Sequence, residues 1–196
     1  MRISNALVLT LLATSGSLPA GETVGVPGSA VRFPTQVQVN VVGKSVPLTL
    51  TGTALRSRFV VNVYSIASYV QTGTSVQTAE QLARANCVRQ LHLVLERDLS
   101  GKDLAEAFRT AVRANYPEPA FNNEVLQLTQ TMNSLSVQKG EHITLTHIPG
   151  VGLHCSVPGK TDFTIKNPQF SDAVWDIYLG ARNLGDHIKK GLTSRL

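Results

Sequence analysis

Apolar and polar residues alternate through two neighbouring segments in the first third of the chain. Valines at every second position alternate with polar residues over 36–42, and a second alternating segment covers 46–51 after Gly43 and Lys44. Alternation with period two predicts strands with one buried face, and the short turn between them predicts a β-hairpin. The segment 59–70 has Val, Ile and Tyr in both phases, which is typical of a central strand covered on both faces.

The remaining periodicities predict strands and helices in separate groups. A strand is expected over 88–96 and a three-strand meander over 143–165. Helices are expected in segments that show apolar residues at helical spacing or cap residues, namely 78–86, 100–112, 120–133, 168–180 and 186–192. Antiparallel strands in runs with helices grouped between them indicate an α+β fold, one sheet packed by helices on one side.

Composition narrows the class of protein. The chain has 196 residues, of which 42% are hydrophobic and 16% charged, so it can bury a core and is not expected to be disordered. Its formal net charge is +5, but the basic residues are scattered and aromatic residues make up only 6%. A nucleic-acid surface would show clustered basic residues with interleaved aromatics, so nucleic acid is not an expected partner.

The first twenty residues predict a secretory signal peptide. Arg2 provides a positive start, an apolar stretch covers 6–13, and small residues end at Ala20. The alternative is a frayed N-terminal helix. The apolar stretch is too short to span a bilayer, and no later segment is continuously apolar enough to do so. We therefore expect a signal peptide over 1–20, a single domain over 21–196 and an exported, periplasmic or secreted protein.

The cysteines and histidines are the candidates for redox and metal chemistry. Cys87 and Cys155 are the only cysteines, and one disulfide or two separate buried thiols are both compatible with the pattern. His142 and His154 fall in the opposite strand phase from His147, so the sheet separates these histidines and no metal site is expected. His147 points toward apolar positions, where it is a candidate to line a pocket or to ligate a haem iron.

A turn is expected near Gly52, and two arginines follow it at the start of the long apolar segment. An arginine cannot be deprotonated and offers a planar fork of donors, so at a pocket mouth it suits a carboxylate, a phenolate or a haem propionate. Arg56 is the candidate for this role. Arg58 is interpreted as a solvated arginine at a strand end or as a partner of Asp98.

Several segments, taken in order, resemble the chalcone isomerase-like family. The segment with Gly52 and Arg56 and the strand that follows it resemble one family signature. The strand-to-helix junction resembles a second signature, and the C-terminal segments resemble those of bacterial members of the family. These segments are 52–56, 59–70, 94–100, 145–152, 159–160 and 170–180. The resemblance implies an open-faced β-sandwich, in which a long antiparallel sheet packs against a helical layer with a ligand cleft between them.

The resemblance also implies candidate site residues. In the plant enzymes of this family an arginine and several hydroxyl and amide donors cyclise a chalcone, and Arg56 stands at the arginine position. Tyr64 stands where those enzymes have a threonine, and Ile177, which cannot donate a hydrogen bond, stands where they have a hydroxyl. The family's tyrosine and asparagine fall within 121–133 without a fixed register. Since each lost donor costs about a hundredfold in rate, flavonoid cyclisation is not expected.

Other residues shared with the family are interpreted as structural, and they are Arg97, Asp98, Pro149, Gly150, Gly152 and Trp175.

Three functions remain open from the sequence. The first is a non-catalytic binder of a fatty acid or similar amphipathic anion, with Arg56, Tyr64, Ile177 and His147 at the ligand. The second is a haem-binding member, in which Arg56 binds a propionate and His147 lies near the iron. The third is an isomerase, an intramolecular lyase, with an unknown substrate. No cofactor is expected in the first or the third, and the oligomeric state is left open.

Overall fold

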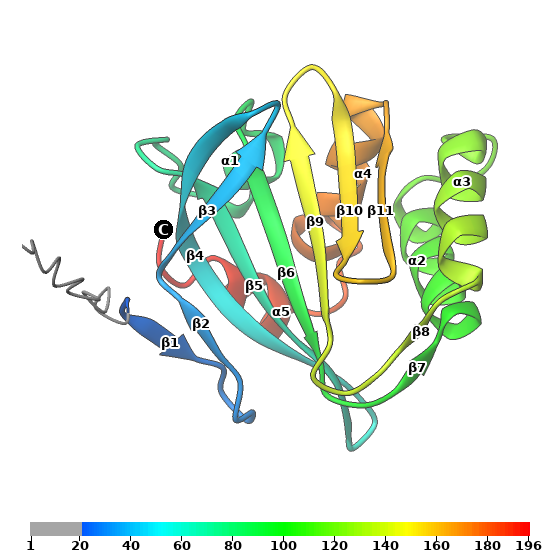
Figure 1. Cartoon of the computed structure of the whole chain (residues 1–196), viewed down its shortest axis with the longest axis horizontal. Helices are drawn as coiled ribbons and strands as arrows, with labels where there is room; N and C mark the ends of the chain where they lie inside the picture. Colours follow the sequence, from blue (N-terminus) through cyan, green and yellow to red (C-terminus); the bar gives the residue numbers. More distant parts are fainter. Residues whose placement is uncertain (1–20) are drawn as a thin grey trace, which may run out of the picture.

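A computed structural model describes residues 21–196, and the predicted signal peptide lies outside these residues. Its centre is a curled seven-stranded antiparallel sheet in the order β11-β10-β9-β6-β5-β4-β3 (Figure 1). The strands are β3 (Gln36–Val41), β4 (Lys44–Arg58), β5 (Val61–Gln71), β6 (Arg89–Leu95), β9 (His142–Ile148), β10 (Gly152–Val157) and β11 (Thr161–Ile165). The predicted hairpin is confirmed as β3 and β4, and the meander as β9 to β11.

The helices pack on one face of this sheet and against one another. They are α1 (Ala79–Arg84), α2 (Gly101–Asn115), α3 (Asn122–Asn133), α4 (Pro168–Leu179) and α5 (Asp186–Leu192). Ser100 caps α2 by accepting a hydrogen bond from the amide of Asp103, and Asn167 caps α4 in the same way through Phe170. The α+β architecture expected from the sequence is therefore confirmed.

The sheet has a separate apolar layer on each face. The helices cover a core that includes Leu91, Leu145 and Trp175. The opposite face is partly covered by a hairpin that the sequence did not predict, formed by β1 (Thr23–Gly25) and β2 (Arg32–Pro34). Phe33 of this hairpin is buried against the sheet. A short pair, β7 (Leu99–Ser100) and β8 (Ser136–Val137), joins the sheet to α2 and α3.

Gly52 lies within a strand, whereas the sequence suggested a turn just before Arg56. The pairing of β4 with β5 shifts register between Leu50 and Gly52, and Gly52 has a φ of +155°. A Cβ atom there would lie 2.1 Å from the carbonyl oxygen of Gly191. Glycine is needed at this bulge because the backbone of α5 approaches β4 this closely.

The C-terminal segment is fastened to the same part of β4. The hydroxyl of Thr51 donates to the carbonyl of Leu192 at 2.9 Å, and the amide of Arg195 donates to the carbonyl of Thr51 at 2.9 Å. Residues more than 140 positions apart in the chain thus form one wall of the molecule.

The start of α3 also differs from the prediction. The helix was expected from residue 120, but it begins at Asn122, after Phe121 in a left-handed conformation and without a side-chain cap. No helix among residues 21–196 is both long and apolar enough to cross a membrane.

Candidate functional site

A cleft of about 610 Å³ lies between the sheet and the helical layer. Its floor comes from β4 and β5, one wall from α2, and the other wall from α4 and the segment that follows it. The apolar lining consists of Val63, Leu99, Leu104, Ala107, Phe108, Ala111, Ala114, Ile177 and Leu184. This volume is within the range of roughly 300–1,000 Å³ typical of small-molecule sites.

Arg56 lies on the floor of this cleft. Its side chain is half-buried, and its Nη1 donates to the main-chain carbonyl of Leu184 at 3.0 Å. No carboxylate in residues 21–196 lies within the 4.0 Å of an ion pair from it. The Leu184 carbonyl fixes one edge of the guanidinium, so the remaining N–H groups are left to bind an anion.

Tyr64 and Tyr178 lie beside Arg56 as neutral phenols. Burial raises the pKa of Tyr64, an effect that Tyr178 and then Arg56 offset in part. Burial also raises the pKa of Tyr178 well above its usual value. Because both hydroxyl groups keep their protons at neutral pH, the pair can supply hydrogen-bond donors but cannot act as a base.

The mouth of the cleft carries three more arginines. Arg58, Arg97 and Arg182 are exposed lining residues, and within the described part of the chain none of them forms an ion pair. The lining carboxylates are engaged elsewhere, since Asp103 accepts from Ser100 and Glu106 pairs with Arg109. The lining therefore has an excess of positive charge.

One sequence interpretation changes at this mouth, and for Arg58 the first of its two alternatives is confirmed. Arg97, interpreted as structural, lines the cleft, whereas Trp175 is a fully buried core residue as expected. Arg58 is an exposed arginine at the end of β4, and Asp98 instead accepts a hydrogen bond from the amide of Lys139.

The structure brings together three of the four residues singled out in the sequence. Arg56, Tyr64 and Ile177 all line the cleft, the first two from β4 and β5 and Ile177 from α4. His147 is separate from them. It is 4% exposed, and its Nδ1 lies 2.9 Å from the hydroxyl of Ser171.

His147 belongs to a buried polar cluster behind β6 and β9. Arg89 is fully buried there, donating to the carbonyl of Leu82 at 2.9 Å and to Asp172 at 2.6 Å. Its guanidinium lies 4.9 Å from the centre of the Trp175 ring. Burial and then Arg89 lower the pKa of His147 to about 4, while Asp172 acts in the opposite direction. This histidine is therefore neutral at pH 7 and joins the packing of the core.

Three other histidines, His92, His142 and His154, lie on the opposite face of the sheet, as strand phase predicted for His142 and His154. His142 contacts His92, with 2.7 Å between ring nitrogens, and His154 lies 2.8 Å from Asp162. Residues 21–196 contain no cluster of three or more His, Cys, Asp or Glu side chains suited to a metal ion. Both cysteines are free thiols, so of the two possibilities left open the structure has no disulfide.

One wall of the cleft comes from a helix that the sequence did not single out for the site. The family's tyrosine and asparagine were expected within 121–133, but no described residue of α3 lines the cleft, and α2 forms that wall. Tyr178 and Arg182 were missed. Tyr178 follows Ile177 in an apolar helix, and Arg182 lies in an irregular segment, so neither carries a periodic signal.

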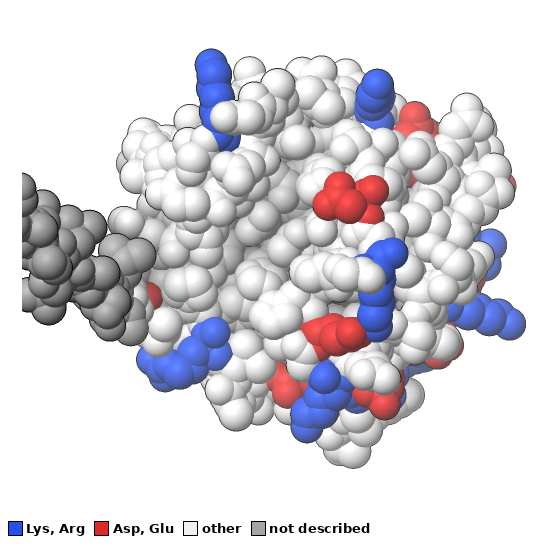
Figure 2. Space-filling model, in the orientation of Figure 1, with Lys and Arg blue, Asp and Glu red and all other residues white. Residues whose placement is uncertain are grey.

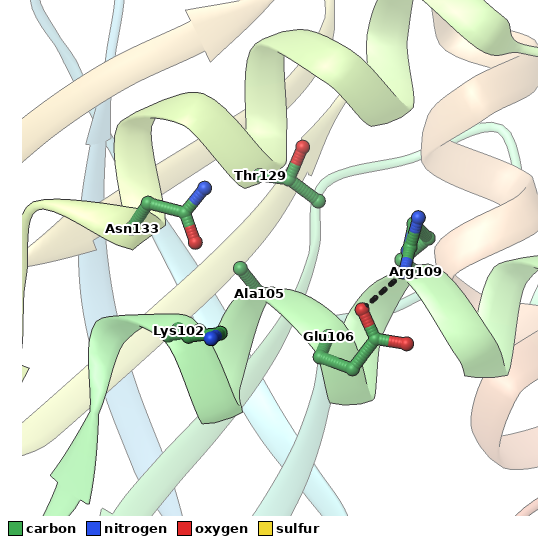
Figure 3. A pocket seen from close by; sticks show the side chains of 6 residues that line it. All are labelled: Lys102, Ala105, Glu106, Arg109, Thr129 and Asn133. Atoms are coloured by element: carbon green, nitrogen blue, oxygen red, sulfur yellow. Dashed lines mark hydrogen bonds and ion pairs between the residues drawn. The ribbon is translucent and has the colours of Figure 1, made fainter.

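A second hollow of about 440 Å³ lies between α2 and α3 (Figure 3). Its lining residues are Lys102, Ala105, Glu106, Arg109, Thr129 and Asn133. Glu106 and Arg109 neutralise each other, and the one buried lining residue, Ala105, has no polar side chain. This hollow lacks the apolar interior of the cleft, which remains the candidate site.

The fold and the cleft define a class of protein. A curled antiparallel sheet with helices on one face and a cleft between the two layers is a chalcone isomerase-like fold. The family model described as chalcone isomerase-like matches residues 27–193, so the chain belongs to the chalcone isomerase-like family.

Solved structures support the same fold. Among 38 matching chains is the crystal structure of a fatty-acid binding protein from Arabidopsis thaliana, with a TM-score of 0.69 and 16% sequence identity. The match covers 88% of this chain and 96% of that chain. No curated protein matches the sequence. At this identity the likeness establishes the shared fold.

Proposed function

We propose that this protein is a non-catalytic binder of a fatty acid or a similar amphipathic anion. The carboxylate binds Arg56 and the acyl chain lies in the apolar cleft between the sheet and α2. The observation that carries the proposal is a half-buried arginine, free of any carboxylate partner in residues 21–196, at the floor of an apolar cleft. Such a site offers one fixed cation and a long apolar wall, which are the two features of this ligand class.

Two further observations support binding over turnover. The cleft lining in the described chain contains no histidine, lysine or cysteine, and its two tyrosines hold their protons. Its two carboxylates are engaged, Asp103 by a hydrogen bond from Ser100 and Glu106 by its ion pair with Arg109. General acid–base catalysis needs a group that changes protonation near the working pH. The shared fold with a fatty-acid binding protein adds to this argument.

We also propose that the protein is exported, since residues 2–20 contain an apolar stretch flanked by Arg2 and small residues.

The proposal is tested by titrating delipidated protein with palmitate and measuring the heat of binding. We expect one site per chain. Arg56→Gln removes a charge-assisted contact worth about 1.5–3 kcal/mol, which corresponds to about a 10- to 100-fold weaker affinity. The exposed Arg195, which does not line the cleft, provides the matched control Arg195→Gln, with unchanged affinity expected. Absence of palmitate binding would refute the function, and equal affinity of both variants would refute the role of Arg56.

An isomerase is the second candidate, favoured by one arrangement in the cleft. Arg56 beside the phenols of Tyr64 and Tyr178 can stabilise a developing oxyanion. A chalcone, the substrate of the family's plant enzymes, is the first probe for wild type and Arg56→Ala, and turnover that the variant loses would support this candidate over a binder. An absorbance spectrum of the purified protein tests the haem-binding alternative, since bound haem gives a Soret band.

A further inference from the structure

The turn between β4 and β5 exposes three consecutive apolar residues, Phe59, Val60 and Val61, here called the apolar tip. Phe59 is 92% exposed, Val60 97% and Val61 46%. The turn lies at the lower end of the sheet in Figure 1, and Figure 2 shows uncharged surface at that end with basic and acidic side chains just above it. Single exposed apolar residues are ordinary on a soluble protein, whereas a contiguous group at a protruding turn indicates a contact surface.

The residues of this turn are poorly suited to the turn itself. Phe59 has a φ of +55°, a left-handed conformation that a short β-turn normally assigns to glycine or asparagine. The turn is nevertheless firmly built. Arg58 pairs with Val61 across it, and the hydroxyl of Ser57 donates to Asn62 at 3.0 Å. An apolar side chain is thus presented at a position where local backbone preference disfavours it, which points to a use for the side chain.

The apolar tip is continuous with the mouth of the cleft. Arg58, directly before it, and Val63, two residues after it, both line the cleft. The guanidinium of Arg58 lies 5.9 Å from the Phe59 ring centre. Arg97 and Arg182 lie at the same mouth and have no ion-pair partner in residues 21–196. An aromatic and aliphatic tip bordered by unpaired arginines is complementary to a phospholipid surface, where apolar groups enter the headgroup boundary and guanidinium groups bind phosphates.

We propose that the apolar tip docks this protein reversibly on an anionic phospholipid membrane and places the mouth of the cleft against the lipid. The purpose of this docking rests on the proposed function, because docking would let an acyl chain pass between the bilayer and the cleft without crossing water. Three apolar side chains bury little area, so docking is transient and needs the arginines as a second attraction.

The chain offers a matched pair of variants for the test. Val42, in the turn at the opposite end of β4, is also exposed, at 86%, and also has a positive φ, of +48°. Asparagine tolerates this conformation, so Phe59→Asn and Val42→Asn both leave the fold intact and each removes one exposed apolar side chain. Only Phe59 adjoins the cleft.

The experiment measures co-sedimentation with phosphatidylcholine vesicles made with and without phosphatidylglycerol. We expect wild type to bind the anionic vesicles and lose binding as salt rises. Phe59→Asn should weaken binding about fivefold or more, and Val42→Asn should leave it unchanged. Equal effects of the two variants, or equal binding to both kinds of vesicle, would overturn the proposal. In Phe59→Trp, the fluorescence emission of the new indole should shift to shorter wavelength on anionic vesicles. An unchanged emission spectrum would also count against docking.

Titration with palmitate in the absence of vesicles separates the two proposals. If Phe59→Asn binds palmitate as wild type does but loses vesicle binding, docking is supported independently of the cleft. If wild type binds palmitate and the tip does not affect vesicle binding, docking is refuted and the proposed function stands. If vesicle binding depends on the tip while palmitate does not bind, docking stands and the fatty-acid proposal is refuted.

Discussion

His147 makes the stability of this protein depend on pH. Its pKa falls from an ordinary value of 6.5 to about 4 in the folded state, chiefly through burial and next through the charge of Arg89. The folded state therefore resists protonation of this residue, whereas the unfolded chain accepts the proton near pH 6.5. A depressed pKa of this kind gives stability that is present above pH 6.5 and is lost as pH falls toward 4.

The magnitude follows from the two pKa values. Between pH 7 and pH 5 the unfolded chain binds most of a proton at this site while the folded state binds little, which lowers the free energy of unfolding by about 2 kcal/mol. This is a substantial part of the roughly 5–15 kcal/mol that stabilises a typical domain. His147→Gln keeps a hydrogen-bonding group near Ser171 and cannot titrate, so its stability should lack this part of the pH dependence.

The assay is urea unfolding at pH 7 and pH 5, followed by the fluorescence of Trp175, the single tryptophan of the sequence. Between pH 7 and pH 5 the free energy of unfolding of wild type should fall by about 2 kcal/mol more than that of His147→Gln. His187→Gln changes an exposed histidine on α5 and should behave like wild type. Identical pH dependence in wild type and His147→Gln would show that the buried cluster accommodates a charged imidazole, contrary to this reasoning.

Two further predictions concern the backbone and the thiols. Gly52→Ala places a Cβ atom 2.1 Å from the carbonyl oxygen of Gly191, so we expect a loss of about 3 kcal/mol or more in urea unfolding, and an unchanged midpoint would contradict the close approach. Cys155 is buried, and burial raises the pKa of its thiol, so a thiol reagent should label it only after unfolding. Cys87 is partly exposed and provides the comparison, and equal labelling rates in the folded protein would refute the assignment.

Local patterns were sufficient to predict most of the fold. The alternation over 36–51 specified the hairpin of β3 and β4, since each valine of β3 turns toward the apolar layer on the outer face. Asn167 and Pro168 indicated the start of α4, because a cap residue and a proline at the first helical position both act on the first turn of the helix. These features depend only on neighbouring residues, which a single sequence displays directly.

Features set by distant contacts were predicted less well. Gly52 suggested a turn, but its role depends on α5, which lies about 140 residues later in the chain. Arg56 was identified through the family resemblance, and the cleft location of Arg97 and Arg182 depends on how β6 and the segment after α4 meet α2. An isolated arginine in a sequence has no periodic pattern, so its location at a cleft mouth becomes evident only in three dimensions.

The cleft also depends on the attachment of the C-terminal segment to β4, and it forms only once these two parts of the chain have come together. Thr51 contacts Leu192 and Arg195, and Arg56 contacts Leu184, so the walls of the site come from opposite ends of the domain. Bringing such distant segments together carries a loop-closure entropy cost that contacts within a hairpin do not. A fragment that stops before α4 would hold Arg56 and Tyr64 but no cleft. The site is therefore a property of the completed tertiary structure and cannot be transferred as a local motif.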